Sequence, residues 1–111
     1  MYESSLIEFD KSDIVIFSAA VSDYKPVNYS KSKIKNRIEK IPLEKNIDIL
    51  KTLASRKKKQ YLVGFALETD NEVDNAYEKI INKKIDLIIL NSLKDKGAGF
   101  GTKTNKIKII D

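Results

Sequence analysis

The residues best suited to chemistry follow a short apolar run near the start of the chain. Residues 14–17 are an unbroken apolar segment, which is typical of a strand buried on both faces. Three small residues come directly after it, Ser18, Ala19 and Ala20, and would let a ligand approach the backbone at the strand's carboxyl end. Asp23 lies just beyond, as an acceptor for a ribose diol. A packed strand followed by an ordinary turn would explain the same pattern, so this stretch alone does not decide between the two readings.

Cations and an aromatic ring are spaced so that they can join this site. Lys79 and Lys83 are four residues apart and fall on one edge of a helix predicted over residues 71–84. Phe65 lies near the end of a second apolar run, and Asn91 directly follows a third. The carboxyl ends of these parallel strands are expected to meet at the same sheet edge. An acidic group, a ring and several cations at one edge indicate a nucleoside triphosphate site. A nucleic-acid groove would instead spread charge along a face with repeated exposed aromatics.

Composition narrows the chemistry further. The chain has 111 residues, a net charge of +5 that suits an anionic partner, no cysteine and no histidine. Disulfides, thiolate chemistry and histidine bases are therefore excluded, and we predict no protein site for a resident metal. No apolar run approaches the ~20 residues of a membrane span, and no signal peptide is recognisable. We expect a cytoplasmic protein without membrane partners.

The elements that must position these residues indicate one α/β domain. We expect a Rossmann-like three-layer sandwich with a mainly parallel sheet, in which the N-terminal part of the fold is missing. Residues 14–17 are predicted to be its central strand, Asn46 to cap a helix, and Gly64 to mark close approach of a ligand or another backbone. The expected helices span residues 2–10, 46–56 and 71–84, the strands span 14–17, 61–66, 86–90 and 106–110, and an irregular loop at 24–32 leads into a mobile flap with an edge strand near 38–43.

Five motifs then carry a family resemblance across nearly the whole chain. SAAVSDY at 18–24, KIK at 33–35, KNIDIL at 45–50, VGFALET at 63–69 and DLIILN at 86–91 occur in this order. The sequence resembles the phosphopantothenoylcysteine synthetase (phosphopantothenate–cysteine ligase) domain of bifunctional coenzyme A biosynthesis proteins. The resemblance implies that residues 1–111 are the C-terminal part of such a domain, with a flexible flap around residues 25–40.

The resemblance also implies an activity and its ligands. The domain would ligate cysteine to 4′-phosphopantothenate through an acyl-cytidylate, with CTP as co-substrate and Mg²⁺. Lys33, on the flap, would support acyl-cytidylate formation as the catalytic residue. The implied nucleotide contacts are Phe17, Ser18, Ala19, Asp23, Lys33, Ile47, Asp48, Ile49, Leu50, Phe65, Lys79 and Lys83.

Departures from the family pattern limit what this chain is expected to do alone. The family often has Pro where Ile47 stands and a basic residue where Asn36 stands. The family's earlier half is absent from this sequence. The flavin-dependent phosphopantothenoylcysteine decarboxylase domain is absent too, and FMN is expected only in that domain. We therefore expect a fragment that binds CTP weakly and does not complete the reaction, and a homodimer with 4′-phosphopantothenate, cysteine and CTP as ligands.

Two other readings stay open at this stage. A non-catalytic basic nucleotide- or RNA-binding module would account for the positive charge. A Rossmann-type oxidoreductase is disfavoured, because the glycines of residues 97–101 neither match the dinucleotide fingerprint nor open a helix after a strand.

Overall fold

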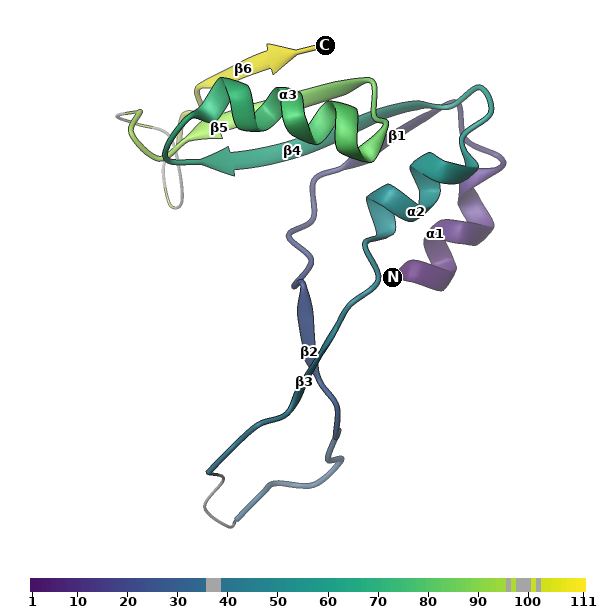
Figure 1. Ribbon diagram of the computed structural model, residues 1–111, viewed down its shortest axis with the longest axis vertical. Coiled ribbons are helices and arrows are strands. Elements are labelled where there is room, and N and C mark those ends of the chain that lie inside the picture. Colours follow the sequence, from purple (N-terminus) through teal and green to yellow (C-terminus); the bar gives the residue numbers. More distant parts are fainter. Residues whose placement is uncertain (36–38, 96, 98–100, 102) are drawn as a thin grey trace.

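A mainly parallel four-stranded sheet is the centre of the fold. The structure is a computed structural model, and it describes residues 1–35, 39–95, 97, 101 and 103–111. The sheet order is β1-β4-β5-β6, in which β1, β4 and β5 are parallel and β6 is antiparallel to β5. The elements are α1 (Tyr2–Phe9), β1 (Ile14–Phe17), β2 (Tyr24–Pro26), β3 (Leu43–Lys45), α2 (Ile49–Arg56), β4 (Tyr61–Glu68), α3 (Glu72–Lys83), β5 (Leu87–Ser92) and β6 (Ile107–Ile110) (Figure 1).

The predicted α/β class and mainly parallel sheet are confirmed. Parallel strands need crossover connections, and α2 and α3 supply them between β1, β4 and β5. The carboxyl ends of these three strands consequently meet at one edge of the sheet, which is where a ligand site was expected. None of the described helices is long and apolar enough to cross a membrane.

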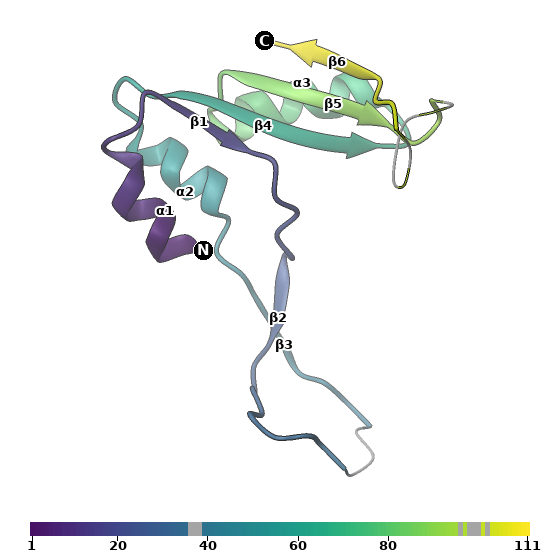
Figure 2. The same cartoon turned by 180° about the vertical axis from the view of Figure 1, so that it is seen from behind.

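The helices pack on one face of the sheet, with the strands in front of α3 in the view of Figure 2. Leu62 and Ile88 are almost fully buried in the core that lies between this face and the helices. A Cβ added at Gly64 would lie 3.0 Å from Ile85 Cδ1 and 3.5 Å from Leu50 Cδ2. The side chains of Ile85 and Leu50, on the helical side of the sheet, therefore leave little room for a larger residue at position 64. The predicted close approach of a ligand or another backbone at Gly64 was wrong.

The opposite face of the sheet is apolar and open. Alternation along each strand places Ile16, Phe65, Leu67 and Ile109 on this face, where they are 61%, 43%, 45% and 64% exposed. The described residues thus form two layers, a helical layer and the sheet.

The position of β1 differs from the prediction. We expected a central strand covered on both faces, but β1 is an edge strand of this sheet and pairs only with β4 among the described strands. Val15 and Phe17 pack on the core, whereas Ile14 and Ile16 are exposed. An unbroken apolar run shows that both faces tolerate apolar side chains, but it does not show what covers them.

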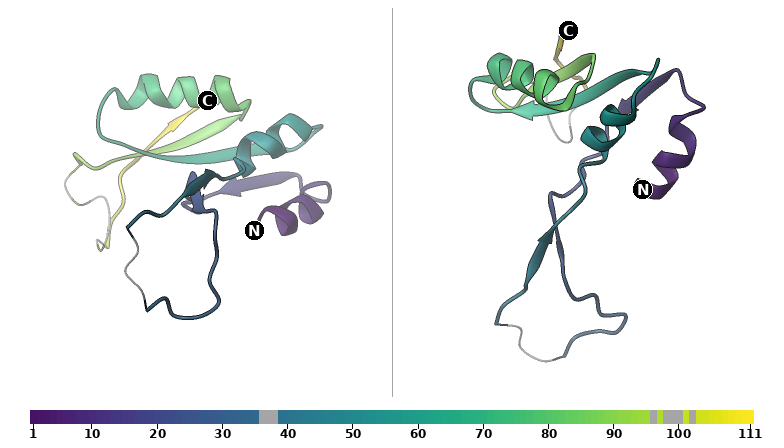
Figure 3. Two further views of the ribbon diagram at one scale, coloured as in Figure 1. Left: turned by 60° about the horizontal axis from the view of Figure 1, so that its bottom comes forward. Right: turned by 45° about the vertical axis from the view of Figure 1, so that its right-hand side comes forward.

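Two short strands form an arm that projects from the body of the molecule (Figure 3). β2 and β3 pair antiparallel, and the Val27 N–H donates to the Pro42 carbonyl at 3.0 Å. The predicted loop 24–32 therefore contains a strand, and the expected edge strand near 38–43 begins only at Leu43 and belongs to the arm. Ile38 lies outside the described residues. Pro26 misled the prediction, because proline is tolerated in a strand that has no neighbour on its N–H side.

The start of α2 is also shifted. Asp48, rather than Asn46, is the N-cap, and its Oδ1 accepts a hydrogen bond from the Lys51 N–H at 2.9 Å. Asn46 instead donates from Nδ2 to the Ser22 carbonyl at 2.8 Å, while its backbone N–H donates to the Asp23 carbonyl at 2.7 Å. Asn46 thus ties the two strands of the arm together where they leave the body.

Candidate functional site

A cavity of about 690 Å³ lies at the carboxyl end of β1, between that strand end and the start of α2. It brings together small strand-end residues, two carboxylates, three aromatic rings and a lysine from α3. The predicted site residues that line it are Phe17, Ser18, Ala19, Asp23, Ile47, Asp48, Ile49, Leu50, Phe65 and Lys83. Residues distant in the sequence thus share one cavity, because parallel strands bring their carboxyl ends to one edge.

Asp48 links the helix start to the lysine of this cavity. Besides capping α2, it forms an ion pair with Lys83, whose Nζ lies 3.0 Å from Asp48 Oδ2. Partial burial works to raise the pKa of Asp48, but the hydrogen bonds from the Lys51 N–H and from Lys83 outweigh it and lower that pKa. Asp48 is therefore ionised at neutral pH and holds Lys83 against the cavity wall.

Asp23 is positioned by the base of the arm. The hydrogen bond from the Asn46 N–H to its carbonyl fixes its backbone, and Ser22 Oγ donates to the Tyr24 carbonyl at 2.7 Å. The importance of Asn46 and Ser22 was missed from the sequence, since Asn46 was expected to cap a helix. A polar residue pair flanking both ends of a hairpin was the signal that could have found them.

Lys79 does not line this cavity. It pairs with Glu68, whose other carboxylate oxygen accepts from Asn75 Nδ2 at 3.2 Å. The hydrogen bond from Lys79 lowers the pKa of Glu68, because it stabilises the ionised carboxylate. Lys79 lines a smaller cavity of about 280 Å³ that shares Lys83 with the larger one. The two lysines are therefore neighbours, but only Lys83 already faces the larger cavity.

Lys33 also lies outside the cavity. It is an exposed residue of the arm, in the loop that follows β2. The sheet body and the arm thus carry different parts of the predicted site, and ten of its twelve residues line the one cavity.

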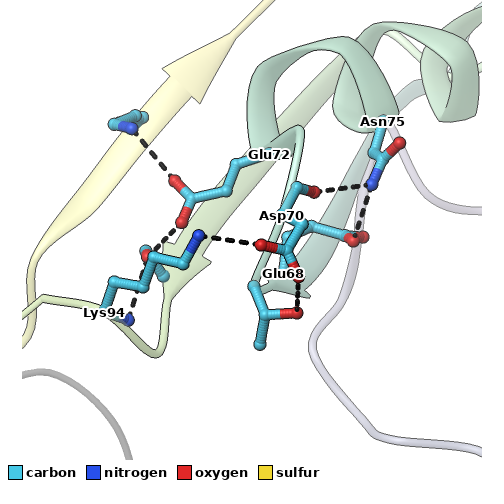
Figure 4. Close-up of polar contacts among 8 residues, drawn as sticks. Glu68, Asp70, Glu72, Asn75 and Lys94 are labelled. Carbon is cyan, nitrogen blue, oxygen red and sulfur yellow. Dashed lines mark hydrogen bonds and ion pairs between the residues drawn. The ribbon is translucent and has the colours of Figure 1, made fainter.

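A network of carboxylates and lysines surrounds the carboxyl end of β4 and was not foreseen from the sequence (Figure 4). Asp70 accepts from Lys94 Nζ at 2.9 Å, and Glu72 accepts from the Ser92 hydroxyl and from Lys108 Nζ at 3.1 Å. The hydrogen bond from Ser92 lowers the pKa of Glu72, and the one from Lys94 lowers that of Asp70. These contacts connect the start of α3 to β5 and β6, so they hold the strand ends in register.

Comparison with known proteins places the chain in a family. The model of the DNA/pantothenate metabolism flavoprotein C-terminal domain matches residues 1–111. The chain belongs to this family. A relative in the flavoprotein C-terminal domain family, named cysteine/cysteine sulfinic acid decarboxylase and from an unidentified prokaryote, is 51% identical over 100% of this chain and 32% of its own length. The coenzyme A biosynthesis bifunctional protein CoaBC of Bacillus subtilis is 44% identical over 99% of this chain and 28% of its own length.

Solved structures agree with this placement. The C-terminal domain of a coenzyme A biosynthesis bifunctional protein CoaBC superposes with a TM-score of 0.69 at 38% identity, covering 81% of this chain and 41% of that one. The DNA/pantothenate metabolism flavoprotein of Streptococcus pneumoniae shares the fold, with a TM-score of 0.63 at 24% identity over 97% of this chain and 59% of that one. The chain therefore spans about a third of its curated relatives and less than half of the solved domain.

The family named from the motifs needs correction. Those motifs were read as marking phosphopantothenoylcysteine synthetases, whereas the matching model is that of the broader flavoprotein C-terminal domain family. One relative in this family carries the name of a decarboxylase of cysteine and cysteine sulfinic acid. The chain is therefore similar over nearly its whole length to proteins that are named for different reactions, because a shared fold does not fix the chemistry of the whole protein.

Proposed function

We propose that this chain carries the nucleotide site of a ligase that joins cysteine to 4′-phosphopantothenate with CTP, in coenzyme A biosynthesis. The observation that supports the proposal best is the single cavity, where small side chains, Asp23, Phe65 and Lys83 lie together. A nucleotide there would have room at Ser18 and Ala19 for its sugar and a cation for its phosphates. The relationship to coenzyme A biosynthesis proteins supplies the choice of substrates.

The proposed reaction has two steps. A carboxylate oxygen of 4′-phosphopantothenate forms a bond to the α-phosphorus of CTP, and the bond from that phosphorus to the bridging oxygen breaks, releasing pyrophosphate. The amino nitrogen of cysteine then attacks the acyl carbon, CMP leaves, and the amine gives up a proton to water. Neither step requires a side chain that titrates near neutral pH, which suits a chain without histidine or cysteine.

Fixed positive charge is the main contribution that we assign to the protein. The first step brings a carboxylate against a phosphate, so a cation near the α-phosphorus lowers the barrier by roughly 3 kcal/mol. Lys83 is already in place, since Asp48 holds it at the cavity wall. Lys79 would reach the phosphates by leaving Glu68, and Lys33 by movement of the arm toward the body.

The cavity also suits Mg²⁺ bound together with a nucleotide. No cluster of three or more metal-binding side chains occurs within residues 1–35, 39–95 and the described positions beyond them. Mg²⁺ in nucleotide sites uses phosphate oxygens with only one or two carboxylates, and Asp23 and Asp48 both line this cavity. When bound, the ion would neutralise phosphate charge.

Several features of the wider protein belong to the same proposal. The bifunctional names of longer relatives support a flavin-dependent phosphopantothenoylcysteine decarboxylase as the fused partner activity, with FMN bound there. We propose a cytoplasmic homodimer, because an arm of two short strands offers exposed edges for a second copy.

Calorimetric titration with CTP and Mg²⁺ tests the nucleotide site. CTP should bind more tightly than ATP or GTP, and Phe65→Ala or Lys83→Ala should weaken CTP binding at least tenfold. Lys58→Ala is the matched control, because Lys58 is an exposed lysine that lines none of the three cavities at the carboxyl edge. Equal affinity for all three nucleotides, or equal effects of Lys83→Ala and Lys58→Ala, would argue against the proposal.

An RNA-binding module is the rival that the same preparation can test. RNA affinity would then fall steeply with salt, since each phosphate contact releases counterions, and CTP would not compete. The gathering of cations in one cavity disfavours this reading, because a nucleic-acid groove would spread its positive charge along a face.

A further inference from the structure

Three lysines line the nucleotide cavity, and they differ in how their charge is balanced. Lys83 pairs with Asp48, and the positive charge of Lys51 also favours the ionised form of Asp48. Lys45 is different, because its side chain forms no ion pair or hydrogen bond with any residue that the structure describes. An anion can therefore bind Lys45 without displacing a carboxylate of the described chain.

The ladder of the arm turns Lys45 toward the cavity. β3 ends at Lys45, which pairs in register with Tyr24, the first residue of β2. Directly opposed residues of an antiparallel pair have their side chains on the same face, and both of these residues line the cavity. The next pair, Lys25 and Glu44, lies on the other face of the ladder, where Lys25 Nζ is 3.2 Å from Glu44 Oε1. Alternation along two short strands thus separates a lysine at the cavity from one that faces away.

Asn46 holds the backbone beside Lys45 in place. Its side chain donates to the Ser22 carbonyl at 2.8 Å, and its N–H donates to the Asp23 carbonyl at 2.7 Å. Lys45 thus lies between its own place in the ladder and a residue that is bonded twice to the segment before β2. A lysine has a long flexible stem, so a fixed backbone limits where its charge can lie and reduces the entropy lost on binding. The base of the arm, where these residues lie, is therefore part of the cavity wall as well as an attachment.

We propose that Lys45 is a further phosphate-binding residue of the nucleotide cavity, and that Asn46 is the residue that positions it. This inference rests on the proposed function and adds a cation that the twelve predicted contacts do not include. Phosphates held by Lys45 from the arm and by Lys83 from α3 connect two parts of the molecule. Nucleotide binding then also orients the arm, which carries Lys33.

Calorimetric titration with CTP and Mg²⁺, and separately with cytidine, distinguishes phosphate contacts from contacts to the sugar and base. Lys45→Ala should weaken CTP binding about tenfold, as expected for one lost hydrogen bond to a charged group. It should change cytidine binding by less than about twofold, because cytidine has no phosphate. Lys45→Arg keeps the charge and should bind CTP within about threefold of wild type. Lys25→Ala, on the other face of the same ladder, is the matched control and should change neither affinity.

A double-mutant cycle tests the positioning role of Asn46. Asn46→Ala removes the side-chain hydrogen bond to the Ser22 carbonyl and should weaken CTP binding about threefold to fivefold. In the Lys45→Ala background the same substitution should have a clearly smaller effect, because the cation that it positions is already absent. Effects that simply add would show that Asn46 does not act through Lys45, and would overturn this part of the inference.

Three other outcomes would overturn the role of Lys45 while the nucleotide site stands. The first is an equal CTP affinity of Lys45→Ala and Lys25→Ala. The second is a loss of cytidine affinity as large as the loss of CTP affinity, and the third is a loss in Lys45→Arg as large as that in Lys45→Ala. If the wild-type chain does not bind CTP at all, the proposed function fails as well, so the wild-type titration separates the two failures.

Discussion

Gly64 shows how one residue couples the sheet to the helices that position the cavity. An added Cβ would lie 3.0 Å from Ile85 Cδ1, the flexible end of a side chain that can shift by a few tenths of an ångström. We expect Gly64→Ala to change the free energy of unfolding by less than about 1 kcal/mol, since reduced chain entropy offsets the crowding. Gly64→Val should cost about 1–3 kcal/mol by overpacking. Urea denaturation of both variants measures the difference, and a Gly64→Val variant as stable as wild type would contradict the close packing.

Asp48 has two separable roles, as helix cap and as partner of Lys83. Asp48→Ala removes both and should cost about 1 kcal/mol of stability, the usual value of a cap. Asp48→Asn keeps the cap acceptor and removes the charge, so it should cost less than about 0.5 kcal/mol, because the pair is partly solvated. Thermal and chemical denaturation of the two variants distinguish the roles. Equal losses would show that the ion pair, not the cap, carries the effect.

At the level of elements, the sequence predicted those with a strong local signature. β4 and α3 lie where expected, since one is a compact apolar run and the other has a clear helical period. The apolar residues of α3 are not all buried. Ala76 is fully buried, whereas Tyr77 and Ile81 are 48% and 73% exposed. A periodic pattern marks one side of a helix, but the width of its contact depends on the neighbouring layer, which local sequence does not encode.

The arm could not be predicted as a separate element for a related reason. Its strands have three residues each, and all six residues are exposed. The sequence therefore shows neither the alternating pattern nor the apolar run by which a strand is usually predicted. The site residues of the body were predictable because strand ends converge by topology. The place of Lys33 depends on how the arm lies, which no local pattern determines.

Lys33 and Lys83 should differ in what they control, because they belong to different elements. Lys33→Ala should change CTP affinity less than threefold, since this exposed arm residue lies outside the cavity lining. In a longer protein that also carries the family's earlier half, its loss should instead slow pyrophosphate release on the order of 10²- to 10³-fold, as for a group that acts only on developing charge. Calorimetry and a pyrophosphate assay measure the two quantities, with Lys31→Ala as a control on the same arm. A large loss of CTP affinity in Lys33→Ala would show that the arm already contacts bound nucleotide.

At the scale of the whole molecule, ionised carboxylates connect the sheet, α3 and the last strands. Glu68, Asp70 and Glu72 all have lowered pKa values because hydrogen bonds from lysines or a hydroxyl favour their ionised forms. A carboxylate with a lowered folded-state pKa stabilises the fold above its unfolded pKa, and this stabilisation is lost as the pH falls through the folded value. We therefore expect the free energy of unfolding to be steady near neutral pH and to decline below about pH 4.

Glu68→Gln tests this linkage at a carboxylate whose side chain is only 15% exposed. The variant should be less stable than wild type at pH 7, and the difference should narrow as the pH falls toward the lowered folded-state pKa of Glu68, because protonation removes the same charge that the substitution removes. Glu8→Gln is the control, since Glu8 pairs with Lys11 at 3.2 Å in an exposed pair of little energetic value. Guanidinium denaturation between pH 3 and 7 gives the curves. If the gap between Glu68→Gln and wild type is the same at every pH between 3 and 7, packing rather than charge explains it. The role of the network in joining the sheet to α3 must then be revised.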